Sequence, residues 1–201
     1  MSGFVPPPYP YDRLDRFRPL AESHPGGVVD LSIGTPFDPP PAAVIEALAS
    51  SGSERSYPPS IGSLPFRQAA QRWMTRRFGV DVDPAQIGAS IGTNEFVETL
   101  PQWLKLRDPS RDTVLYPAVA YPTYEMGAVL ASCRAVPVRA MPDGRLDLAA
   151  IDPADAARAL MLWVNSPSNP TGALDDLEAA AAWGRERGVP VFSDECYVEF
   201  T

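Results

Sequence analysis

The chain is poor in the residues that many catalytic and metal sites use. Its 201 residues include one histidine, His24, a single lysine, Lys105, and two cysteines. A metal site built on several histidines therefore lacks support, and so does a Ser-His-Asp catalytic triad. We expect no bound metal. Two cysteines make no disulfide framework, so we expect Cys133 and Cys196 to be small core residues of apolar strands in a reducing compartment.

The sequence also lacks a long apolar run and an excess of basic residues. No segment is apolar for long enough to span a bilayer, and no signal peptide is recognisable. The net charge is −8, which does not favour binding to nucleic-acid phosphates or to anionic membranes. We therefore expect no nucleic-acid partner, no membrane contact and a cytoplasmic location.

The residues that are present are typical of a globular protein. They are 45% hydrophobic and 21% charged. The 24 prolines cluster in an extended N-terminal arm, residues 1–11, and in loops. In the first half of the chain, apolar spacing predicts helices over 12–23, 41–49 and 64–78 and strands over 28–33 and 86–91.

Strands and helices alternate in the second half of the chain, which predicts a parallel sheet covered by helices. The expected strands are 112–116, 133–139, 159–164 and 189–193. The expected helices are 95–106, 121–131 and 174–188, with a short helix somewhere within 146–157. The predicted class is α/β: a three-layer α/β/α sandwich with a mostly parallel sheet, incomplete at the C-terminus. We expect an N-terminal arm with part of a small domain over 1–45, and a large domain over 46–201.

Two polar motifs follow the last two predicted strands. Asn165-Ser-Pro-Ser-Asn169-Pro-Thr-Gly172 follows the apolar run 159–164, and Asp194-Glu-Cys-Tyr197 follows the strand 189–193. The carboxyl ends of parallel strands meet at one edge of a sheet, where open α/β proteins bind their ligands. Asn169, Asp194 and Tyr197 are therefore candidates for one site.

In this order, the motifs resemble the core of the fold-type I class I/II aminotransferases, which depend on pyridoxal 5′-phosphate (PLP). The resemblance implies a cis bond before Pro170 and places Asp194 against the ring nitrogen of PLP, with Asn169 and Tyr197 donating to the phenolic oxygen. A carboxylate favours the protonated form of that nitrogen, and a protonated ring withdraws charge from the substrate.

Two further segments match the cofactor site of the same family. Gly92-Thr-Asn-Glu95 precedes a predicted helix, whose free N–H groups could bind the cofactor phosphate together with Thr93 and Asn94. Ordinary helix capping is the alternative. The resemblance also implies that Tyr121 stacks on the pyridine ring. The alternative is that Tyr121 and Tyr124 are loop and core aromatics.

Two residues nearer the N-terminus, Gly34 and Tyr57, also match functional positions of this family. The resemblance implies that Gly34 approaches the α-carboxylate of the substrate by its backbone. It also implies a homodimer in which Tyr57 reaches the cofactor phosphate of the other subunit. Taken alone, each is simply a loop residue.

The lysine that holds PLP in this family has no counterpart here, since Lys105 is predicted to be a helix-end cation. We expect the chain to be the N-terminal part of a longer aminotransferase and inactive by itself. Its N-terminal run, from Tyr9 to Pro40, resembles the actinobacterial type of succinyldiaminopimelate aminotransferase. That implies amino-acid and 2-oxo-acid substrates, glutamate as amino donor, and lysine biosynthesis.

Three alternatives remain beside this interpretation. Another PLP enzyme of fold type I, such as a carbon–sulfur lyase, would carry the same cofactor motifs. A truncated, noncatalytic module could bind or dimerise without turnover. A nucleotide-binding α/β domain is disfavoured, because the chain contains neither G-x-G-x-x-G nor G-x-x-x-x-G-K-[ST].

Overall fold

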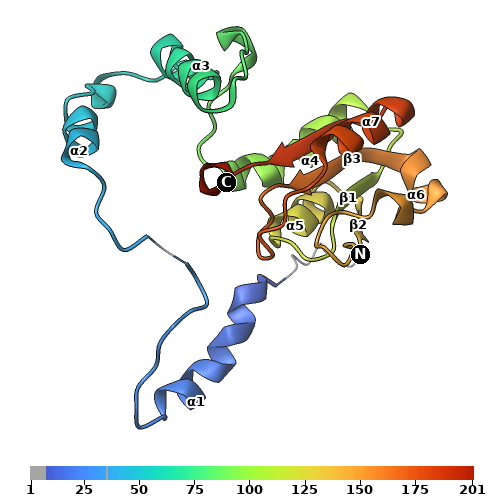
Figure 1. The fold of residues 1–201 in the computed structure, drawn as a ribbon, viewed down its shortest axis with the longest axis horizontal. Helices are drawn as coiled ribbons and strands as arrows, with labels where there is room; N and C mark the ends of the chain where they lie inside the picture. The colour runs from blue at the N-terminus through green and yellow to red at the C-terminus, as the bar shows by residue number, and fades with distance from the viewer. Residues whose placement is uncertain (1–7, 35) are drawn as a thin grey trace, which may run out of the picture. The chain divides into compact units, whose positions relative to one another are not determined.

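The computed structural model describes residues 8–34 and 36–201, and Figure 1 shows their helices and strands. The chain forms two compact units. The first combines Met1–Asp12 with Gly92–Thr201, and the second is Arg13–Ile91. The extended arm predicted for 1–11 lies mostly outside the described residues. The predicted division into domains at residue 45 stays a prediction.

The first unit is built on a four-stranded parallel sheet. Its strands are β1 (Thr113–Pro117), β2 (Arg134–Val138), β3 (Ala159–Asn165) and β4 (Val191–Asp194), in the order β2-β1-β3-β4. All seven residues of β3 are buried. A strand between two neighbours and covered on both faces must be apolar throughout, which explains the run 159–164.

Helices cover both faces of this sheet (Figure 1). On one face, Val97 and Leu100 of α4 (Thr93–Arg107) pack with Tyr124 of α5 (Thr123–Leu130). On the other face, Ala156 of α6 (Pro153–Arg158) and Trp183 of α7 (Leu177–Arg187) form a second core cluster. The predicted α/β class and its parallel sheet between helical layers are confirmed.

Helix boundaries differ from the prediction where side chains cap them. α7 begins at Leu177, later than predicted, because the Asp176 carboxylate accepts a hydrogen bond from Ala179 N at 2.9 Å and ends the preceding loop. The segment 146–157 divides into a 3₁₀ turn, η4 (Leu148–Ala150), and α6, whose N-cap is Asp152. A last 3₁₀ turn, η5 (Val198–Phe200), follows β4.

Charged side chains hold the segments that lead into β1 and β3, at the amino-terminal edge of the sheet. The Arg111 guanidinium donates to the carbonyl of Ala159 at 2.7 Å, and Arg158 pairs with Asp112.

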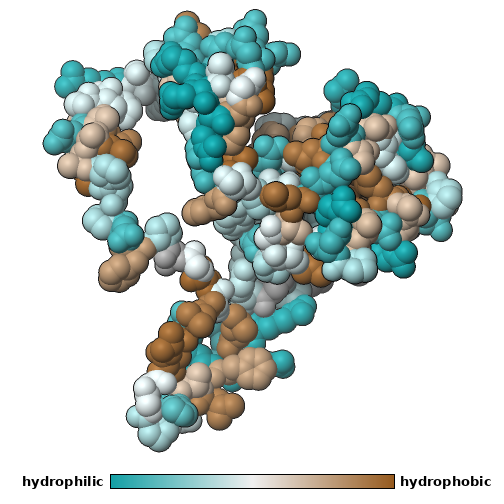
Figure 2. All heavy atoms as spheres, in the orientation of Figure 1, coloured by the Kyte–Doolittle hydropathy of each residue, from teal (hydrophilic) through white to brown (hydrophobic). Residues whose placement is uncertain are grey.

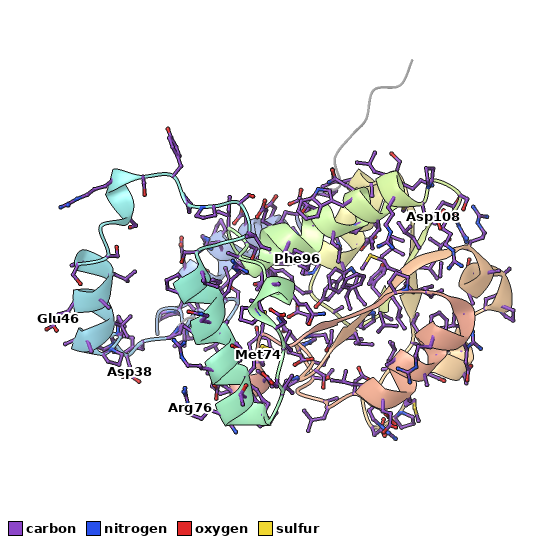
Figure 3. The ribbon with its side chains drawn as sticks, turned by 90° about the horizontal axis from the view of Figure 1, so that it is seen from above. Asp38, Glu46, Met74, Arg76, Phe96 and Asp108 are labelled. Carbon is purple, nitrogen blue, oxygen red and sulfur yellow. The ribbon has the colours of Figure 1, made fainter. Side chains whose placement is uncertain are left out.

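The Lys105 ammonium donates to the carbonyls of Pro109 and Arg111, both at 2.8 Å. Figure 3 labels Phe96 near the start of α4 and Asp108 just after its end. Lys105 is thus a cation at the carboxyl end of its helix, as predicted.

The second unit consists of helices joined by irregular segments. They are η1 (Pro10–Phe17), whose first residues belong to the other unit, α1 (Arg18–Glu22), α2 (Ala42–Ala49), η2 (Ser53–Arg55), α3 (Leu64–Phe78) and η3 (Pro84–Gln86). The predicted helices 41–49 and 64–78 are confirmed, and 12–23 is helical with a 3₁₀ first half. Figure 2 shows apolar side chains at the surface around α2, and Leu20, Leu31 and Phe37 are exposed.

The strands predicted over 28–33 and 86–91 are wrong, because neither segment is a strand in the structure. A strand exists only where a neighbour completes its hydrogen-bond ladder. The bond from Ala89 N to the carbonyl of Ile61, at 3.0 Å, is isolated and forms no ladder. Val29 and Leu31 alternate in sequence with polar residues, yet both are exposed.

No helix among the described residues has the length and apolar character needed to cross a membrane.

The first unit is expected to lose stability at alkaline pH. Burial raises the pKa of Tyr116 to about 12, from an ordinary value of 10.0. Between pH 10 and 12 the unfolded chain therefore releases the Tyr116 proton while the folded chain keeps it, so stability falls as pH rises. Urea unfolding at pH 8 and pH 11 would measure the loss. Tyr116→Phe should make it smaller, and Tyr57→Phe, on a fully exposed ring, should leave it unchanged.

Candidate active site

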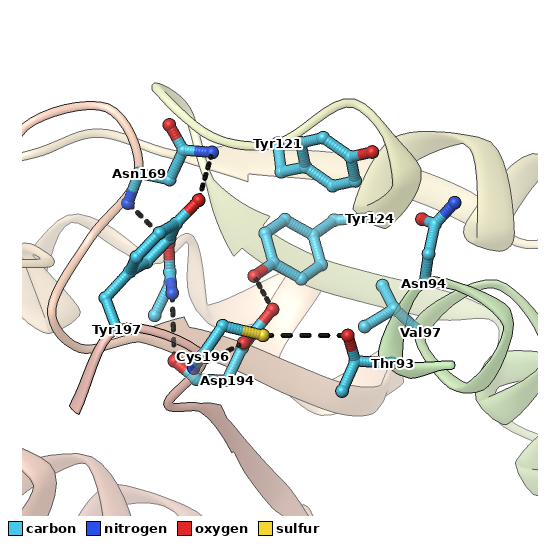
Figure 4. Close-up of a pocket in the computed structure, with 10 residues that line it drawn as sticks. Thr93, Asn94, Val97, Tyr121, Tyr124, Asn169, Asp194, Cys196 and Tyr197 are labelled. Atoms are coloured by element: carbon cyan, nitrogen blue, oxygen red, sulfur yellow. Dashed lines mark hydrogen bonds between the residues drawn. The ribbon is translucent and has the colours of Figure 1, made fainter. Parts of the chain in front are cut away.

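A cavity of about 220 Å³ opens where β3 and β4 end (Figure 4). The predicted cofactor residues of the first unit all line it: Thr93, Asn94, Tyr121, Asn169, Asp194 and Tyr197. Val97, Tyr124, Asn165 and Cys196 complete the lining. Residues far apart in sequence therefore meet at the sheet edge that the strand order predicts.

Asp194, the last residue of β4, is held by two hydrogen bonds. Its Oδ2 accepts from the Tyr124 hydroxyl at 2.7 Å, and its Oδ1 accepts from Cys196 N at 3.2 Å. Each carboxylate oxygen has capacity for a further donor. Burial, and then the hydrogen bond to Asp194, raise the pKa of Tyr124 well above its ordinary value. Tyr124 therefore keeps its proton and remains a donor to the carboxylate.

The Tyr124 side chain is fully buried among aromatic rings. Its ring centroid lies 5.3 Å from that of Trp163, which lies 5.7 Å from that of Phe192. Such packing fixes the ring and hence the direction of its hydroxyl. The interpretation of Tyr124 as a core aromatic was right, but its bond to Asp194 was missed. The available signal was a second tyrosine three residues after Tyr121, at the start of the helix.

Asn165, the last residue of β3, ties the loop 166–169 to the end of β4. It is 3% exposed. Its amide nitrogen donates to the carbonyls of Asp194 (2.9 Å) and Pro167 (3.2 Å), and its amide oxygen accepts from Asn169 N (2.7 Å). Sequence reasoning placed Asn165 at this edge but gave it no role. The structure makes it the residue that fixes Asn169 relative to Asp194.

Asn169 and Tyr197 face each other across the mouth of the cavity (Figure 4). The Asn169 amide nitrogen lies 3.5 Å from the Tyr197 hydroxyl. Both groups can donate a hydrogen bond to an oxygen atom of a molecule bound in the cavity. The peptide bond before Pro170 is cis, as the motif implied, and the bond before Pro167 is cis as well.

Tyr121 presents a half-buried ring to the cavity, and a residue of the N-terminal arm touches it. The hydroxyl groups of Tyr9 and Tyr121 lie 3.3 Å apart. This hydrogen bond raises the pKa of Tyr9 to about 12. Tyr9 was not among the predicted site residues, because nothing in a proline-rich arm indicates which side chain returns to the sheet.

The start of α4 forms another part of the cavity wall. Its N-cap is Gly92, whose φ of 125° is a conformation that residues with a side chain rarely adopt. No side chain of the described chain caps this helix, so its first N–H groups remain available to an anion. The Asn94 amide oxygen accepts a hydrogen bond from the Thr123 hydroxyl at 2.7 Å.

Cys196 corrects a prediction. It was expected to be a core residue of an apolar strand, but it is exposed and lines the cavity. The reason is that β4 ends at Asp194, so Cys196 lies in the turn beyond the strand. Its thiol lies 3.7 Å from the Thr93 hydroxyl. Cys133, by contrast, is buried as predicted.

The cavity fits the cofactor that the motifs imply. Its lining includes a carboxylate, an aromatic ring, an amide–hydroxyl pair and an uncapped helix N-terminus. That set matches a flat aromatic cation that carries a phenolic oxygen and a phosphate. The described residues contain no cluster of three or more side chains suited to a metal.

Two predicted site residues belong to the second unit. The Tyr57 side chain is fully exposed, and a side chain added at Gly34 would meet no atom within 4 Å. Both are therefore accessible where they lie. Their roles toward a partner subunit and toward a substrate stay predictions.

The chain is similar to known transaminases along almost its whole length. It is 38% identical over 197 residues to 4-dedimethylamino-4-oxo-anhydrotetracycline transaminase of Streptomyces rimosus, covering 96% of this chain and 52% of that protein. It is 34% identical over 204 residues to LL-diaminopimelate aminotransferase of Aquifex aeolicus, covering 97% and 52%. The chain thus spans about half the length of these relatives.

Solved structures show the same likeness. An aminotransferase of Neisseria meningitidis matches with a TM-score of 0.86 at 28% identity, over 96% of this chain and 51% of that one. N-succinyldiaminopimelate aminotransferase of Mycobacterium tuberculosis matches with a TM-score of 0.75 at 30% identity, over 94% and 50%. The family model "Aminotransferase class I and II" matches residues 26–201. The chain therefore belongs to the class I and II aminotransferases.

Proposed function

We propose that the intact protein is a PLP-dependent aminotransferase that moves an amino group from an amino acid to a 2-oxo acid. The observation that carries the proposal is the Asp194 carboxylate, held between the Tyr124 hydroxyl and Cys196 N in a cavity lined by Tyr121, Asn169 and the start of α4. The family typically uses PLP, which when bound supplies an electron-withdrawing ring for chemistry at the substrate α-carbon.

In this proposal each side chain acts on one part of the cofactor. Asp194 holds a proton on the ring nitrogen, because a carboxylate beside a base favours its charged form. Asn169 and Tyr197 donate to the phenolic oxygen, and Tyr121 lies against the ring face. Thr93, Asn94 and the free N–H groups of α4 bind the phosphate.

The active assembly in this proposal is a homodimer with its site shared between subunits. Tyr57 would reach the phosphate bound by the other subunit, and Gly34 would receive the substrate α-carboxylate through its backbone. The large exposed side chains of the second unit support an assembly that covers them, since exposed apolar surface favours association. Sedimentation of the intact protein would show a dimer if this is right.

We propose N-succinyldiaminopimelate as the substrate, with 2-oxoglutarate and glutamate as the second pair, which places the protein in lysine biosynthesis. Two observations support this choice. The run from Tyr9 to Pro40 resembles the actinobacterial enzymes of that type, and a mycobacterial enzyme so named shares the fold at 30% identity. LL-diaminopimelate and the tetracycline intermediate named for the relatives are the competing substrates to assay.

The test separates the half-reactions of the intact protein. Glutamate alone should yield about one 2-oxoglutarate per site and then stop, because the amino group stays on the protein until a second 2-oxo acid accepts it. Adding the oxo form of each candidate substrate, which for the tetracycline intermediate is the 4-oxo compound itself, should restart turnover only for the right one. A carbon–sulfur lyase would instead release ammonia continuously from a sulfur amino acid. A protein that produced no 2-oxoglutarate from glutamate would contradict the proposal.

A further inference from the structure

A buried hydroxyl, which none of the predicted roles uses, contacts Asn94, a residue that lines the cavity. Thr123 is the first residue of α5 and is 4% exposed. Its hydroxyl donates to the amide oxygen of Asn94, in the first turn of α4, at 2.7 Å. The bond joins two helices whose N-termini both face the cavity, across a sequence separation of 29 residues.

The two helices are packed closely enough for this bond to be rigid. Gly127, one turn after Thr123, approaches the backbone of α4 directly: a Cβ built there would lie 2.8 Å from the carbonyl oxygen of Glu98. Because backbone atoms of both helices meet at this contact, no flexible side chain there can move to let the helices shift. The first turn of α4 is therefore held against the first turn of α5, and Thr123 contacts Asn94 in a fixed geometry.

An asparagine amide has an acceptor end and a donor end, and only the donor end attracts an anion. The structure places the Asn94 amide oxygen against the Thr123 hydroxyl, which therefore donates to it, and the NH₂ group is left for other partners. We propose that Thr123 is a positioning residue that sets the Asn94 amide so that it donates to the cofactor phosphate. This inference rests on the proposed function, since it requires that a phosphate-bearing cofactor binds here.

The expected loss of cofactor affinity on removing the Thr123 hydroxyl follows from the kind of hydrogen bond that Asn94 makes to the phosphate. A hydrogen bond to a charged phosphate is stronger than one between neutral groups. When Thr123 no longer donates, the Asn94 amide can turn and present its oxygen to the anion. Removing the Thr123 hydroxyl should therefore weaken binding of the phosphate form by about tenfold, and should leave binding of the same ring without phosphate unchanged.

The experiment measures dissociation constants for the intact protein freed of cofactor, with pyridoxamine 5′-phosphate and pyridoxamine as probes. Both probes lack the aldehyde, so neither is held covalently. Thr123→Val is expected to weaken only the phosphorylated probe, and Thr123→Ser, which keeps the hydroxyl, should bind like the wild type. Equal loss for both probes, or no loss for either, would overturn the inference.

A double-mutant cycle guards against an indirect effect of the valine on folding. Asn94→Ala should show the same phosphate-selective loss, and adding Thr123→Val to it should cost nothing more, because the two residues act through one amide. Additive losses would overturn the inference while leaving the proposed function standing. If the wild type binds neither probe, the proposed function itself fails.

Discussion

Replacing Asp194 with asparagine in the intact protein is expected to lower turnover by roughly a hundredfold to a thousandfold, as for other preorganised electrostatic groups. The stability of the fold should change little. Asparagine has the shape of aspartate and keeps an oxygen that can accept from the Tyr124 hydroxyl. The bond from Cys196 N to the other oxygen is lost, but Cys196 is exposed, so water can replace that acceptor. What it loses is the negative charge, and with it the preference for a protonated ring nitrogen.

Asp194→Ala separates the two contributions of this side chain. It should lower turnover at least as much, and it should also destabilise the fold by about 1–3 kcal/mol, because the buried Tyr124 hydroxyl loses its acceptor. Steady-state rates with denaturant unfolding measure both effects. Asp143→Asn is the matched control, since Asp143 is an exposed carboxylate paired with Arg145. Wild-type rates from Asp194→Asn would refute the assignment of Asp194 to the ring nitrogen.

Asn165→Ala is expected to destabilise the first unit by about 3 kcal/mol, the upper part of the range for buried polar groups left unsatisfied. The Asn165 amide makes three hydrogen bonds in a buried position. Without it, Asn169 N and the carbonyl of Pro167 lose these partners. The carbonyl of Asp194 keeps only its bond from Ser166 N. Equilibrium unfolding in urea measures the loss.

Two further variants make this prediction specific. Asn169→Ala is the matched control: its side chain is half-buried and makes only the 3.5 Å contact with Tyr197 among the described residues, so it should cost less than about 1 kcal/mol. Asn165→Asp keeps the acceptor for Asn169 N but places a charge beside two carbonyl oxygens, so it should be at least as unstable as the alanine. Equal stability of Asn165→Ala and Asn169→Ala would contradict the role given to Asn165.

The parallel sheet could be predicted from sequence because its signals are local. The apolar run 159–164 and the polar residues Asn165 and Asp194 after two strands are visible without knowing the neighbours. In the first half, the same reasoning failed for 28–33 and 86–91. Alternation of apolar and polar residues predicts a strand only if another strand pairs with it, and no such partner is found among the described residues.

The candidate site shows the same limit of sequence-based prediction, which finds local patterns but not contacts between distant residues. Motifs identified the residues that touch the cavity from loops, such as Asn169 and Asp194, because their spacing is contained in one segment. The residues that hold them could not be found this way. Tyr124 lies 70 positions from Asp194, and Thr123 lies 29 positions from Asn94. Only the packing of α5 against the sheet and beside α4 brings these pairs together.

The most direct test of the account is a crystal structure of the intact protein with PLP bound. The pyridine nitrogen is expected within hydrogen-bond distance of a carboxylate oxygen of Asp194, with the Tyr124 hydroxyl still bonded to that carboxylate. The phosphate is expected at the first turn of α4. A ring whose nitrogen faced away from Asp194, or a phosphate bound elsewhere, would contradict the account.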